Sequence, residues 1–416
     1  MKTGRDKMAL IVMKFGGTSV ADTQKIEGAA AKVAREVALG HQVAVVVSAM
    51  SGVTNQLVDY CTKISPLHDA REYDVVVASG EQITSGLMAL ALQKQGLNAR
   101  SWQGWQVRVK TNDVHGKARI AGIETDELRK RLNSGEVAVV PGFQGVTDDG
   151  RVTTLGRGGS DTSAVALAAA LKADRCDIYT DVDGVYTTDP RIVPQARKMK
   201  KISYEEMLEL ASVGAKVLQT RSVEIAMKKD VPVQVLSSFE DHIGSDLPGT
   251  LVTREEDIVE QELVSGIAYT RDEAKVTLLR VPDRPGVASK IFSPLATAAV
   301  NVDMIVQNVS SDGKTTDITF TIPEADLPRT METLKSIKDM EYGELVTSTD
   351  VAKISVVGIG MRSHSGVANT MFKTLAEKGI NIQVISTSEI KISVLIEEDY
   401  TELAVRSLHA AYGLEE

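Results

Sequence analysis

The stretch LIVMKFGGTSV, Leu10–Val20, runs from apolar and β-branched residues into two glycines. This pattern predicts a buried strand that ends at a glycine turn and is followed by a helix. Glycines at such a turn let backbone N–H groups approach a phosphate, and Lys14 beside them adds a positive charge. No GxxxxGK[ST] pattern is present, so the stretch is not a Walker A loop. A tight turn with a solvated lysine is the simpler alternative.

Downstream of this stretch, short β-branched runs alternate with longer helical patterns as far as about Gln195. Alternation of this kind indicates βαβ units around a mainly parallel sheet, and so an α/β fold. Ser160 and Asp161 are both good N-cap residues, and we expect them to begin a helix. The predicted strands are Ala9–Phe15, Gln42–Ser48, Val137–Pro141 and Asp177–Thr180, and the predicted helices are Asp22–Leu39, Glu81–Lys94 and Thr162–Leu171.

A second glycine-rich stretch is TTLGRGGSDTSA, Thr153–Ala164. Arg157 stands between glycines, where its guanidinium can bind a carboxylate through two hydrogen bonds. Ser160 and Asp161 follow at the expected helix start, which is a favourable place for an anion. The stretch therefore predicts an anion-binding site, with an arginine-capped loop as the alternative.

A third stretch, YTDVDGVYTTDPR, follows an apolar strand and carries three aspartates in an irregular loop. The EF-hand spacing and its distal glutamate are absent, so contact with a metal-bound nucleotide fits better than a calcium loop. An acidic surface turn is the alternative. Farther along, Lys216 follows a glycine ahead of a helical run, where it could reach a phosphate, but taken alone it is better explained as a solvated lysine.

Two more stretches add polar residues near the expected strand ends, VVVSAMSGVTNQL and ASGEQITSGL. Ser48 and Thr54 flank a loop after a strand, and Glu81 opens a helix among small residues. A carboxylate in that position can hold a substrate ammonium group. Capping and turn formation are the alternatives, because these residue types serve both purposes.

The C-terminal part contains an internal repeat. At an offset of 80 residues, Gly286, Val287 and Ala288 fall on Gly366–Ala368, and each copy reads strand, helix, strand, strand, helix. A repeat with this order predicts two ferredoxin-like βαββαβ modules. A turn cluster near Pro248 marks the boundary, so the predicted ranges are 8–250 for the first domain, 251–263 for a linker, and 264–345 and 346–416 for the two modules.

Composition excludes several classes of partner. The formal net charge is -9 and aromatic residues make up 4% of the chain, so neither a basic field nor stacking platforms for nucleic acid are expected. Cys61 and Cys176 lie far apart without a CxxC pattern, which argues against a disulfide framework or a zinc site and for a cytoplasmic location. The apolar run Met8–Met13 is too short for a signal peptide, and no stretch is expected to cross a membrane.

Taken in order, these stretches and the paired C-terminal modules resemble the aspartokinase family, in its shorter monofunctional form with two ACT domains. The resemblance runs from about Met8 to the C-terminus. It implies a three-layer amino-acid-kinase domain with a mainly parallel sheet, followed by tandem ferredoxin-like ACT domains. The implied reaction transfers phosphate from ATP, with Mg²⁺, to the side-chain carboxylate of L-aspartate, giving 4-phospho-L-aspartate for lysine, threonine, methionine and diaminopimelate synthesis.

The resemblance also assigns roles to individual residues. The catalytic pair is Lys14 and Asp161, and no protein side chain is expected to hold a metal, because Mg²⁺ comes with ATP. Aspartate is held by Thr54, Glu81, Arg157 and Ser160, with Arg157 on the α-carboxylate and Glu81 toward the ammonium. ATP is held by Lys14, Phe15, Gly16, Gly17, Ser48, Thr180, Asp181, Tyr186, Arg191 and Lys216.

For the ACT domains, the resemblance implies feedback inhibition by lysine, threonine or both, and assembly into a homodimer or homotetramer. The effector residues would be Asp283, Gly286, Val287, Ala288, Gln307, Asn308, Ser365, Gly366, Val367, Asn381, Ile382, Thr387, Ser388 and Glu389. Two positions depart from the family pattern: Gln219 replaces a common His, and Ser365 replaces a common Pro. The alternatives are another small-molecule kinase of the same fold and a catalytically silent amino-acid sensor.

Overall fold

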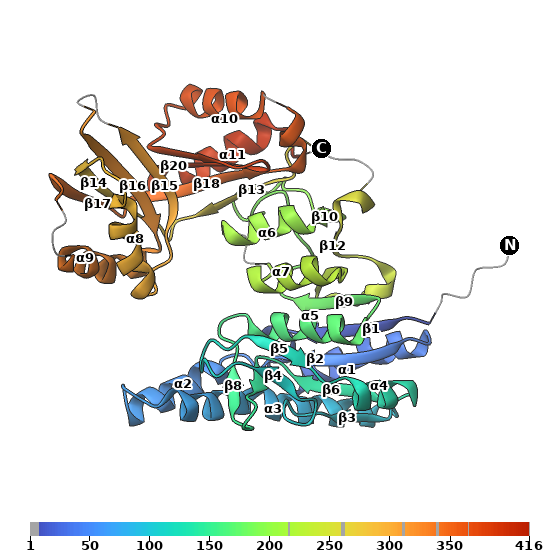
Figure 1. The fold of residues 1–416 in the computed structure, drawn as a ribbon. Helices are drawn as coiled ribbons and strands as arrows, with labels where there is room; N and C mark the ends of the chain where they lie inside the picture. Colours follow the sequence, from blue (N-terminus) through green and yellow to red (C-terminus); the bar gives the residue numbers. More distant parts are fainter. Residues whose placement is uncertain are drawn as a thin grey trace. The chain divides into compact units, whose positions relative to one another are not determined.

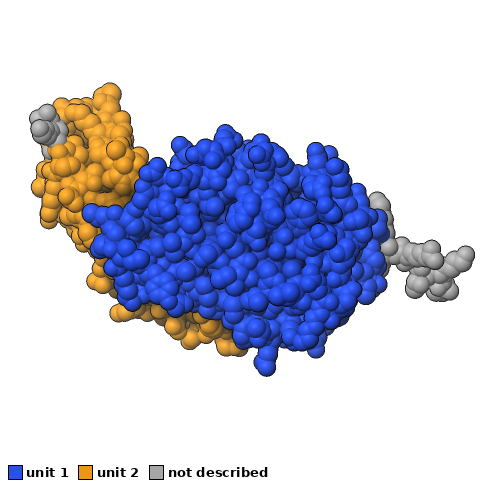
Figure 2. All heavy atoms as spheres, turned by 90° about the horizontal axis from the view of Figure 1, so that it is seen from below, with its two compact units in different colours: residues 1–185, 198–211, 216–259 blue, residues 186–197, 212–215, 260–416 orange. Residues whose placement is uncertain are grey.

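The structure is a computed structural model that describes residues 8–214, 217–258, 263–309, 313–337, 341–364 and 366–415. Contacts within the chain group it into two compact units, coloured separately in Figure 2. Unit 1 comprises residues 1–185, 198–211 and 216–259, and unit 2 comprises residues 186–197, 212–215 and 260–416.

Unit 1 is built on an eight-stranded sheet (Figure 1). All neighbouring strands are parallel except β11 and β12, which are antiparallel. The strand order is β10 (Lys201–Ser203), β12 (Thr250–Thr253), β11 (Val233–Ser237), β9 (Arg175–Thr180), β1 (Leu10–Phe15), β2 (Gln42–Val47), β6 (Val137–Pro141) and β3 (Ala99–Ser101). The predicted mainly parallel sheet is confirmed.

Strand β1 lies in the middle of this sheet, paired with β2 on one side and β9 on the other. Its apolar side chains are almost fully buried, as a parallel strand covered on both faces requires. Successive side chains point to opposite faces, so Met13 and Phe15 face one layer of helices while Lys14 faces the other. The carboxyl ends of β1, β2, β9 and β11 meet at one edge, and the glycine turn after β1 lies at that edge.

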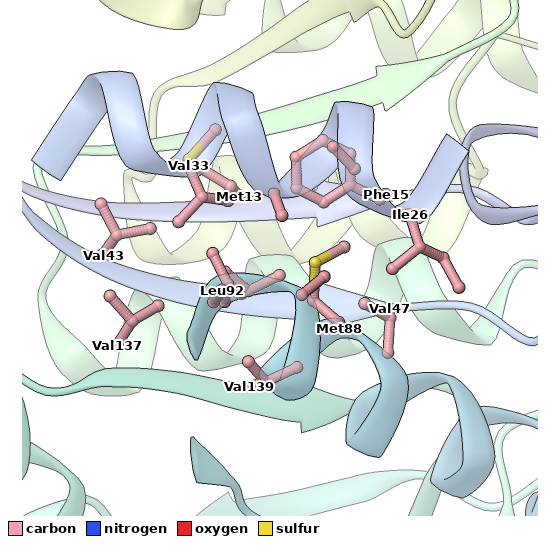
Figure 3. Close-up of a cluster of buried hydrophobic side chains, with 14 of the residues drawn as sticks. Met13, Phe15, Ile26, Val33, Val43, Val47, Met88, Leu92, Val137 and Val139 are labelled. Atoms are coloured by element: carbon pink, nitrogen blue, oxygen red, sulfur yellow. The ribbon is translucent and has the colours of Figure 1, made fainter. Parts of the chain in front are cut away.

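Helices cover both faces of the sheet. Figure 3 shows the core on one face, where Ile26 and Val33 of α1 and Met88 and Leu92 of α3 pack on the strands. On the other face, α5 contacts β1 and β9, and α7 packs against α5. The helices of unit 1 are α1 (Thr23–Ala38), α2 (Val53–Ile64), α3 (Ala70–Lys94), α4 (Asp126–Asn133), α5 (Gly159–Leu171), α6 (Tyr204–Ser212) and α7 (Thr220–Lys229).

Helix boundaries differ from the prediction in two places. The prediction began one helix at Glu81, but α3 begins at Ala70, and its additional turns include the buried Asp74. Ser160 and Asp161 were expected as caps, but they lie inside the first turn of α5, because Gly158 takes the N-cap position with a φ of 69°. Asp22 does cap α1, where its side chain accepts a hydrogen bond from the backbone N–H of Lys25.

A smaller four-stranded sheet completes unit 1. Its order is β5 (Ile120–Ile123), β4 (Val109–Thr111), β7 (Gln144–Val146) and β8 (Val152–Thr154). Strand β8 leads directly into the glycine-rich loop that carries Arg157. This sheet therefore determines where the loop begins.

Unit 2 contains two further four-stranded sheets with helices. The first has the order β15 (Asp303–Val309), β16 (Thr315–Ile322), β14 (Ala274–Pro282) and β17 (Glu344–Ser348), with helices α8 (Val287–Thr297) and α9 (Leu327–Ser336). The second has the order β13 (Gly266–Thr270), β18 (Val351–Val357), β20 (Lys391–Glu397) and β19 (Val384–Thr387), with helices α10 (Gly366–Glu377) and α11 (Thr401–Ala411). The order of elements in each predicted module is thus observed.

Strand β13 comes before the first module in sequence but pairs with β18 in the second sheet. The two modules are also joined by a cluster of charges around the buried Lys353. The Nζ atom of Lys353 lies 2.5 Å from Glu273 Oε1 and 2.8 Å from Asp303 Oδ2. Burial alone would lower the pKa of Lys353, but these two carboxylates outweigh it, and the pKa is raised. The range predicted for the first module, 264–345, therefore includes one strand of the second sheet.

Helix α3 is the one helix among the described residues that is long and apolar enough to cross a membrane by length and composition, although no such stretch was expected from the sequence. Over half of its most apolar window, 56%, is buried inside the protein. Its inner face packs on β2, β3 and β6. The helix therefore has the placement of a core helix.

Candidate functional site

The centre of the site is an ion pair between β1 and the first turn of α5. Lys14 Nζ lies 2.6 Å from Asp161 Oδ1, and the two residues are only 7% and 9% exposed. The alternation of side chains along β1 points Lys14 toward α5, which explains why a charged residue stands in an otherwise apolar strand. The pair places a cation at the carboxyl edge of the sheet, beside the N-terminus of a helix.

The glycine turn after β1 lies next to this cation. A Cβ atom on Gly16 would stand 3.3 Å from Lys14 Nζ, and one on Gly17 would stand 3.0 Å from the carbonyl oxygen of Ala49. The N–H of Gly16 donates to the carbonyl of Tyr179 over 3.1 Å. Side chains at either position would crowd the ammonium group and the loop after β2, so the absence of a Cβ keeps the space beside Lys14 open.

The loop after β2 closes one side of the site. Ser48 follows the strand directly and donates its N–H to the carbonyl of Phe15 over 3.1 Å. Thr54 is half-buried in the first turn of α2, after Gly52 with its φ of 83°. Gly80 of α3 fits against this loop so closely that a Cβ atom there would stand 2.8 Å from that of Ala49. The two helices and the loop therefore form one packed wall.

Glu81 of α3 is the most perturbed carboxylate in this wall. It is 3% exposed, and its Oε2 atom has no hydrogen-bond partner among the described residues. Burial raises the pKa of Glu81 to about 7, although the backbone N–H of Ala49 acts in the opposite direction. A buried carboxylate with one oxygen left without a partner is unfavourable for folding and is typical of a ligand site.

Arg157 lies in the loop between β8 and α5, flanked by Gly156 and Gly158, which both have positive φ. Its side chain is exposed and has no hydrogen-bond or ion-pair partner in the part of the chain that the structure describes. A Cβ atom on Gly158 would stand 1.9 Å from the side chain of Gln219. Gln219, the residue that departs from the family pattern, thus packs against the loop that carries Arg157.

Ser160 is buried in the first turn of α5. A Cβ atom on Gly142 would stand 2.9 Å from the Cβ atom of Ser160, so α5 approaches the end of β6 closely. Ser160 therefore lies on the same side of α5 as the carboxyl edge of the sheet.

Asp74 supports the loop that carries Arg157. No sequence pattern singled out this residue. It is fully buried in α3, lies 2.7 Å from His115 Nδ1, and accepts a hydrogen bond from Thr154 Oγ1 over 2.5 Å. The N–H of Gly116 donates to the same carboxylate. These bonds tie α3 to β8 just before the Arg157 loop. No local signal marks Asp74, because an aspartate in a helix usually lies on the surface.

The predicted nucleotide residues beyond the glycine turn and Ser48 fall into three groups. Thr180 and Asp181 lie where β9 ends, and the Thr180 hydroxyl donates to the Asp181 carboxylate over 3.1 Å. Tyr186 and Arg191 belong to unit 2, where Arg191 forms an ion pair with Asp189 over 2.7 Å. Lys216 lies outside the described residues.

A cavity of about 320 Å³ adjoins the site between α1 and the segment after β11. Among the predicted residues only Phe15 lines it, and its ring stacks on that of Tyr179 at 4.8 Å. Lys25, Lys32 and Arg35 of α1 line the opposite wall. The Lys32 ammonium donates to the carbonyl of Glu240, so this charge already has a partner. No group of three potential metal ligands occurs in the described residues.

The predicted effector residues lie in unit 2. Gly286 caps α8 with a φ of 92°, and Gly366 is the first residue of α10. Strands β15 and β19 lie against each other. The first set occupies the end of β14, the start of α8 and β15: Asp283, Gly286, Val287, Ala288, Gln307 and Asn308. The second set occupies the start of α10 and the region around β19: Gly366, Val367, Asn381, Ile382, Thr387, Ser388 and Glu389, while Ser365 lies outside the described residues.

The predicted substrate residues of unit 1 have side chains of the kinds that suit a small zwitterion and a phosphate. Among the described residues, Glu81 offers one carboxylate oxygen without a hydrogen-bond partner, Arg157 offers an unpaired guanidinium, and Lys14 offers a cation next to the glycine turn. These groups complement an ammonium, a carboxylate and a phosphoryl group respectively.

Comparisons with known proteins agree with this chemistry. A model of the amino acid kinase family matches residues 9–237, and models of the ACT domain match residues 275–339 and 354–412. The aspartokinase of Pseudomonas aeruginosa is 56% identical over 411 residues, covering 98% of both chains.

Among solved structures, E. coli aspartokinase III with aspartate and ADP matches at 27% identity with a TM-score of 0.80, covering 97% of this chain and 99% of that one. The same E. coli protein with lysine and aspartate matches at 27% identity with a TM-score of 0.74, covering 96% and 99% respectively.

Proposed function

The chain belongs to the aspartokinase family, and on that premise we propose which of its residues bind the substrates and transfer the phosphoryl group. The reaction is the ATP-dependent phosphorylation of the side-chain carboxylate of L-aspartate to 4-phospho-L-aspartate. The observation that carries the proposal is the buried pair of Lys14 and Asp161 at the sheet edge, supported by the unpartnered Oε2 atom of Glu81.

Aspartate is recognised through its α-amino and α-carboxylate groups. Arg157 binds the α-carboxylate with its two parallel N–H groups, and the glycines on either side of it leave room for that approach. Glu81 receives the ammonium group, which supplies the partner that its Oε2 atom lacks. Thr54 and Ser160 complete the pocket from the first turns of α2 and α5.

The chemical step needs no general base, because the aspartate β-carboxylate is already ionised near neutral pH. The difficulty is that an anion must approach a polyanion, so the protein has to supply positive charge and correct positioning. Lys14 places its ammonium beside the transferring phosphoryl group. Asp161 holds that ammonium in position without occupying the open space over Gly16.

ATP is held at the carboxyl ends of β1, β2 and β9. The glycine turn offers N–H groups to the phosphates, and the space that a Cβ atom on Gly16 or Gly17 would fill supports this fit. Mg²⁺ would arrive bound to the nucleotide and neutralise phosphate charge. The remaining nucleotide contacts assigned from the family pattern are Phe15, Ser48, Thr180, Asp181, Tyr186, Arg191 and Lys216.

The two ACT domains regulate this activity. We propose that end-product amino acids bind at the glycine turns before α8 and α10, near the adjoining strands β15 and β19. The similar structure of E. coli aspartokinase III that contains lysine supports lysine as one effector. We favour joint action of lysine and threonine, and assembly of a cytoplasmic homodimer or homotetramer through these domains.

A hydroxamate assay tests the function directly, because hydroxylamine traps an acyl phosphate. Purified protein is given ATP, Mg²⁺ and L-aspartate, with L-glutamate as the control substrate. Product from aspartate alone is expected. Lysine and threonine, added singly and together at millimolar concentration, are expected to lower the rate. A rate that neither amino acid changes would contradict the regulatory proposal.

The second candidate is an amino-acid sensor that has lost its catalytic activity. Folded protein that binds ATP but forms no product from aspartate would favour this alternative. The presence of Lys14, Asp161, Glu81 and Arg157 together argues against it.

A further inference from the structure

Two residues assigned to ATP, Tyr186 and Arg191, lie in a segment that is built into the second ACT module. This segment, residues 186–197, is called the nucleotide loop below. It belongs to unit 2 together with both ACT modules (Figure 2). Ile192 and Val193 are buried in the same core as residues of α10 and α11, and Tyr186 packs against that core. The nucleotide loop therefore depends on the second ACT module for its position.

The two ends of the nucleotide loop are hydrogen-bonded to each other at Thr187. The N–H of Thr187 donates to the carbonyl of Arg197 over 2.9 Å, and the N–H of Arg197 donates to Thr187 Oγ1 over 3.0 Å. Strand β13 adds two further bonds. The N–H of Ile267 donates to the carbonyl of Thr187 over 2.7 Å, and the Tyr269 hydroxyl donates to the Asp189 carboxylate over 3.2 Å. Thr187 is thus the point at which the loop is fixed.

His409 of α11 also contacts this point. Its Nε2 atom lies 2.9 Å from Thr187 Oγ1 in a hydrogen bond, and both residues are 0% exposed. The other ring nitrogen, Nδ1, has no hydrogen-bond partner among the described residues, and Glu415 Oε1 lies 3.9 Å from it. Burial lowers the pKa of His409, with the charge of Glu415 opposing this effect and that of Arg197 adding to it. The ring is therefore neutral near pH 7.

Packing alone does not account for a histidine at this position. The neighbouring inward side chains of α11 are apolar, and Val405 and Leu408 are fully buried. A buried ring with one unpartnered nitrogen is less favourable for folding than a leucine of similar size. Arg406 of the same helix also binds the nucleotide loop, because its Nε atom donates to the carbonyl of Ile192 over 3.0 Å. What distinguishes His409 is thus its bond to the loop.

We propose that His409 is a positioning residue for ATP: its hydrogen bond to Thr187 fixes the nucleotide loop on α11 and so holds the two ATP residues of that loop in place. This inference rests on the proposed function, which assigns Tyr186 and Arg191 to ATP. The Arg191 side chain is 87% exposed and pairs with Asp189 of the same loop, so packing does little to orient it. Without the His409 bond, more of the loop has to be ordered when ATP binds, which lowers affinity.

The first test compares two substitutions of His409 in the hydroxamate assay of the full chain. His409→Leu removes the hydrogen bond at similar volume, and we expect the KM for ATP to rise about fivefold, the size of one lost hydrogen bond. Because His409 does not touch the reacting atoms, kcat and the KM for aspartate should stay within about twofold. His409→Gln keeps a side-chain amide for Thr187 and should restore the KM for ATP. Titration calorimetry with ATP and Mg²⁺ should show the same order of affinities.

A second substitution and a control separate positioning from stability. Thr187→Val removes the hydroxyl at similar volume and should also raise the KM for ATP, and adding His409→Leu to it should cause no further rise. Tyr412→Phe is the matched control in the same core, because it removes the bond from the Tyr412 hydroxyl to the carbonyl of Val367, 2.8 Å long. Its KM for ATP should equal that of the original chain. Thermal melts show that each variant is folded.

The possible outcomes distinguish this proposal from the proposed function. An unchanged KM for ATP in folded His409→Leu would overturn the proposal, and so would an equal rise in Tyr412→Phe, since that would reflect a weakened core only. A chain that binds ATP but forms no hydroxamate would refute the proposed function, while the calorimetric affinities would still test His409. Absence of ATP binding to the original chain would overturn both.

Discussion

Lys14 and Asp161 illustrate how single residues acquire a function from their place in the fold. Lys14 is the one charged residue of β1, and the alternation along the strand directs it to the face covered by α5. Asp161 lies in the first turn of that helix, where the backbone dipole already favours a negative charge. The pair is therefore held from two elements at once, which keeps the ammonium in position before substrates arrive.

Lys14→Met is expected to lower kcat by about 10²-fold or more, in the range found for other charge-stabilising groups. The hydroxamate assay measures this, and isothermal titration of L-aspartate should show that binding changes much less. Lys25→Met serves as the control, since Lys25 is an exposed lysine of α1 whose ammonium faces the Phe239 ring. A folded Lys14→Met protein with a kcat within threefold of the original would refute the assigned role.

Glu81 makes the stability and the activity depend on pH in opposite directions. Its folded-state pKa is about 7 against an ordinary value of 4.5, so between these values the folded state binds more protons than the unfolded one. The free energy of unfolding should therefore fall as pH rises through this window, by at most about 3 kcal/mol. Affinity for aspartate should rise over the same window, because the ionised carboxylate binds the ammonium.

Glu81→Gln separates these two effects. Without ligand, its melting temperature at pH 8 should exceed that of the original chain, and the difference should vanish near pH 4, where both side chains are neutral. Aspartate binding should be weak at every pH, while ATP binding is kept. Thermal melts and titration calorimetry at both pH values measure this, and a variant that binds aspartate normally would exclude Glu81 from the site.

At the scale of elements, the glycine loop between β8 and α5 links the small sheet to the site. Asp74 ties β8 to α3, and Gln219 fills the space beside Gly158. The loop is therefore held from both sides, and Arg157 at its tip is the part left free. The site is assembled from loops at the ends of rigid strands and helices, a common source of precise positioning.

Gly158→Ala should disturb this loop in two ways. Its φ of 69° is unfavourable for alanine by about 1–2 kcal/mol, and the new methyl group would displace Gln219. We expect the KM for aspartate to rise at least tenfold, because Arg157 loses its position. Gly135→Ala is the control, with a φ of 82° and no atom near its Cβ position. It should lose similar stability with no change in KM, and equal KM values for the two variants would contradict the argument.

Much of the element structure followed from the sequence, for physical reasons. The β1 run is apolar because both faces of that strand are covered, and the glycines after it mark its end. The start of α3 was missed because the segment around Asp74 mixes buried charge with β-branched residues, which local preference does not assign to a helix. The Lys14–Asp161 contact joins segments far apart in sequence, so spacing predicted the residues but not the ion pair.

At the scale of the whole molecule, the two units do not follow one another along the chain. Residues 186–197 interrupt the sequence of unit 1, yet Ile192, Val193 and Ala196 are buried in the same core as α10 and α11. This core, and the placement of β13 in the second sheet, depend on contacts across long stretches of chain. No local pattern reports them, which explains why the predicted boundaries treated the domains as consecutive.

A chain that ends at residue 258 should therefore not behave as an independent kinase domain. Removing the rest of unit 2 exposes the apolar side chains of residues 186–197, so we expect aggregation and faster trypsin cleavage after Arg191 and Arg197 than in the full chain. Light scattering and mass spectrometry of the digests measure this. A truncated chain that stays monodisperse, with the cleavage rate of the full chain, would show that the segment is stable without unit 2.

The pairing of β13 with β18 also has a consequence for the order of events on the ribosome. Thr270 pairs with Lys353, so the first strand of this sheet leaves the exit tunnel about 80 residues before its partner. At roughly 5–20 residues per second, β13 waits several seconds with its hydrogen-bonding edges unpaired. During that interval the first ACT module can complete its own sheet. Nascent chains stalled just before residue 351 should consequently be the ones that chaperones bind most strongly.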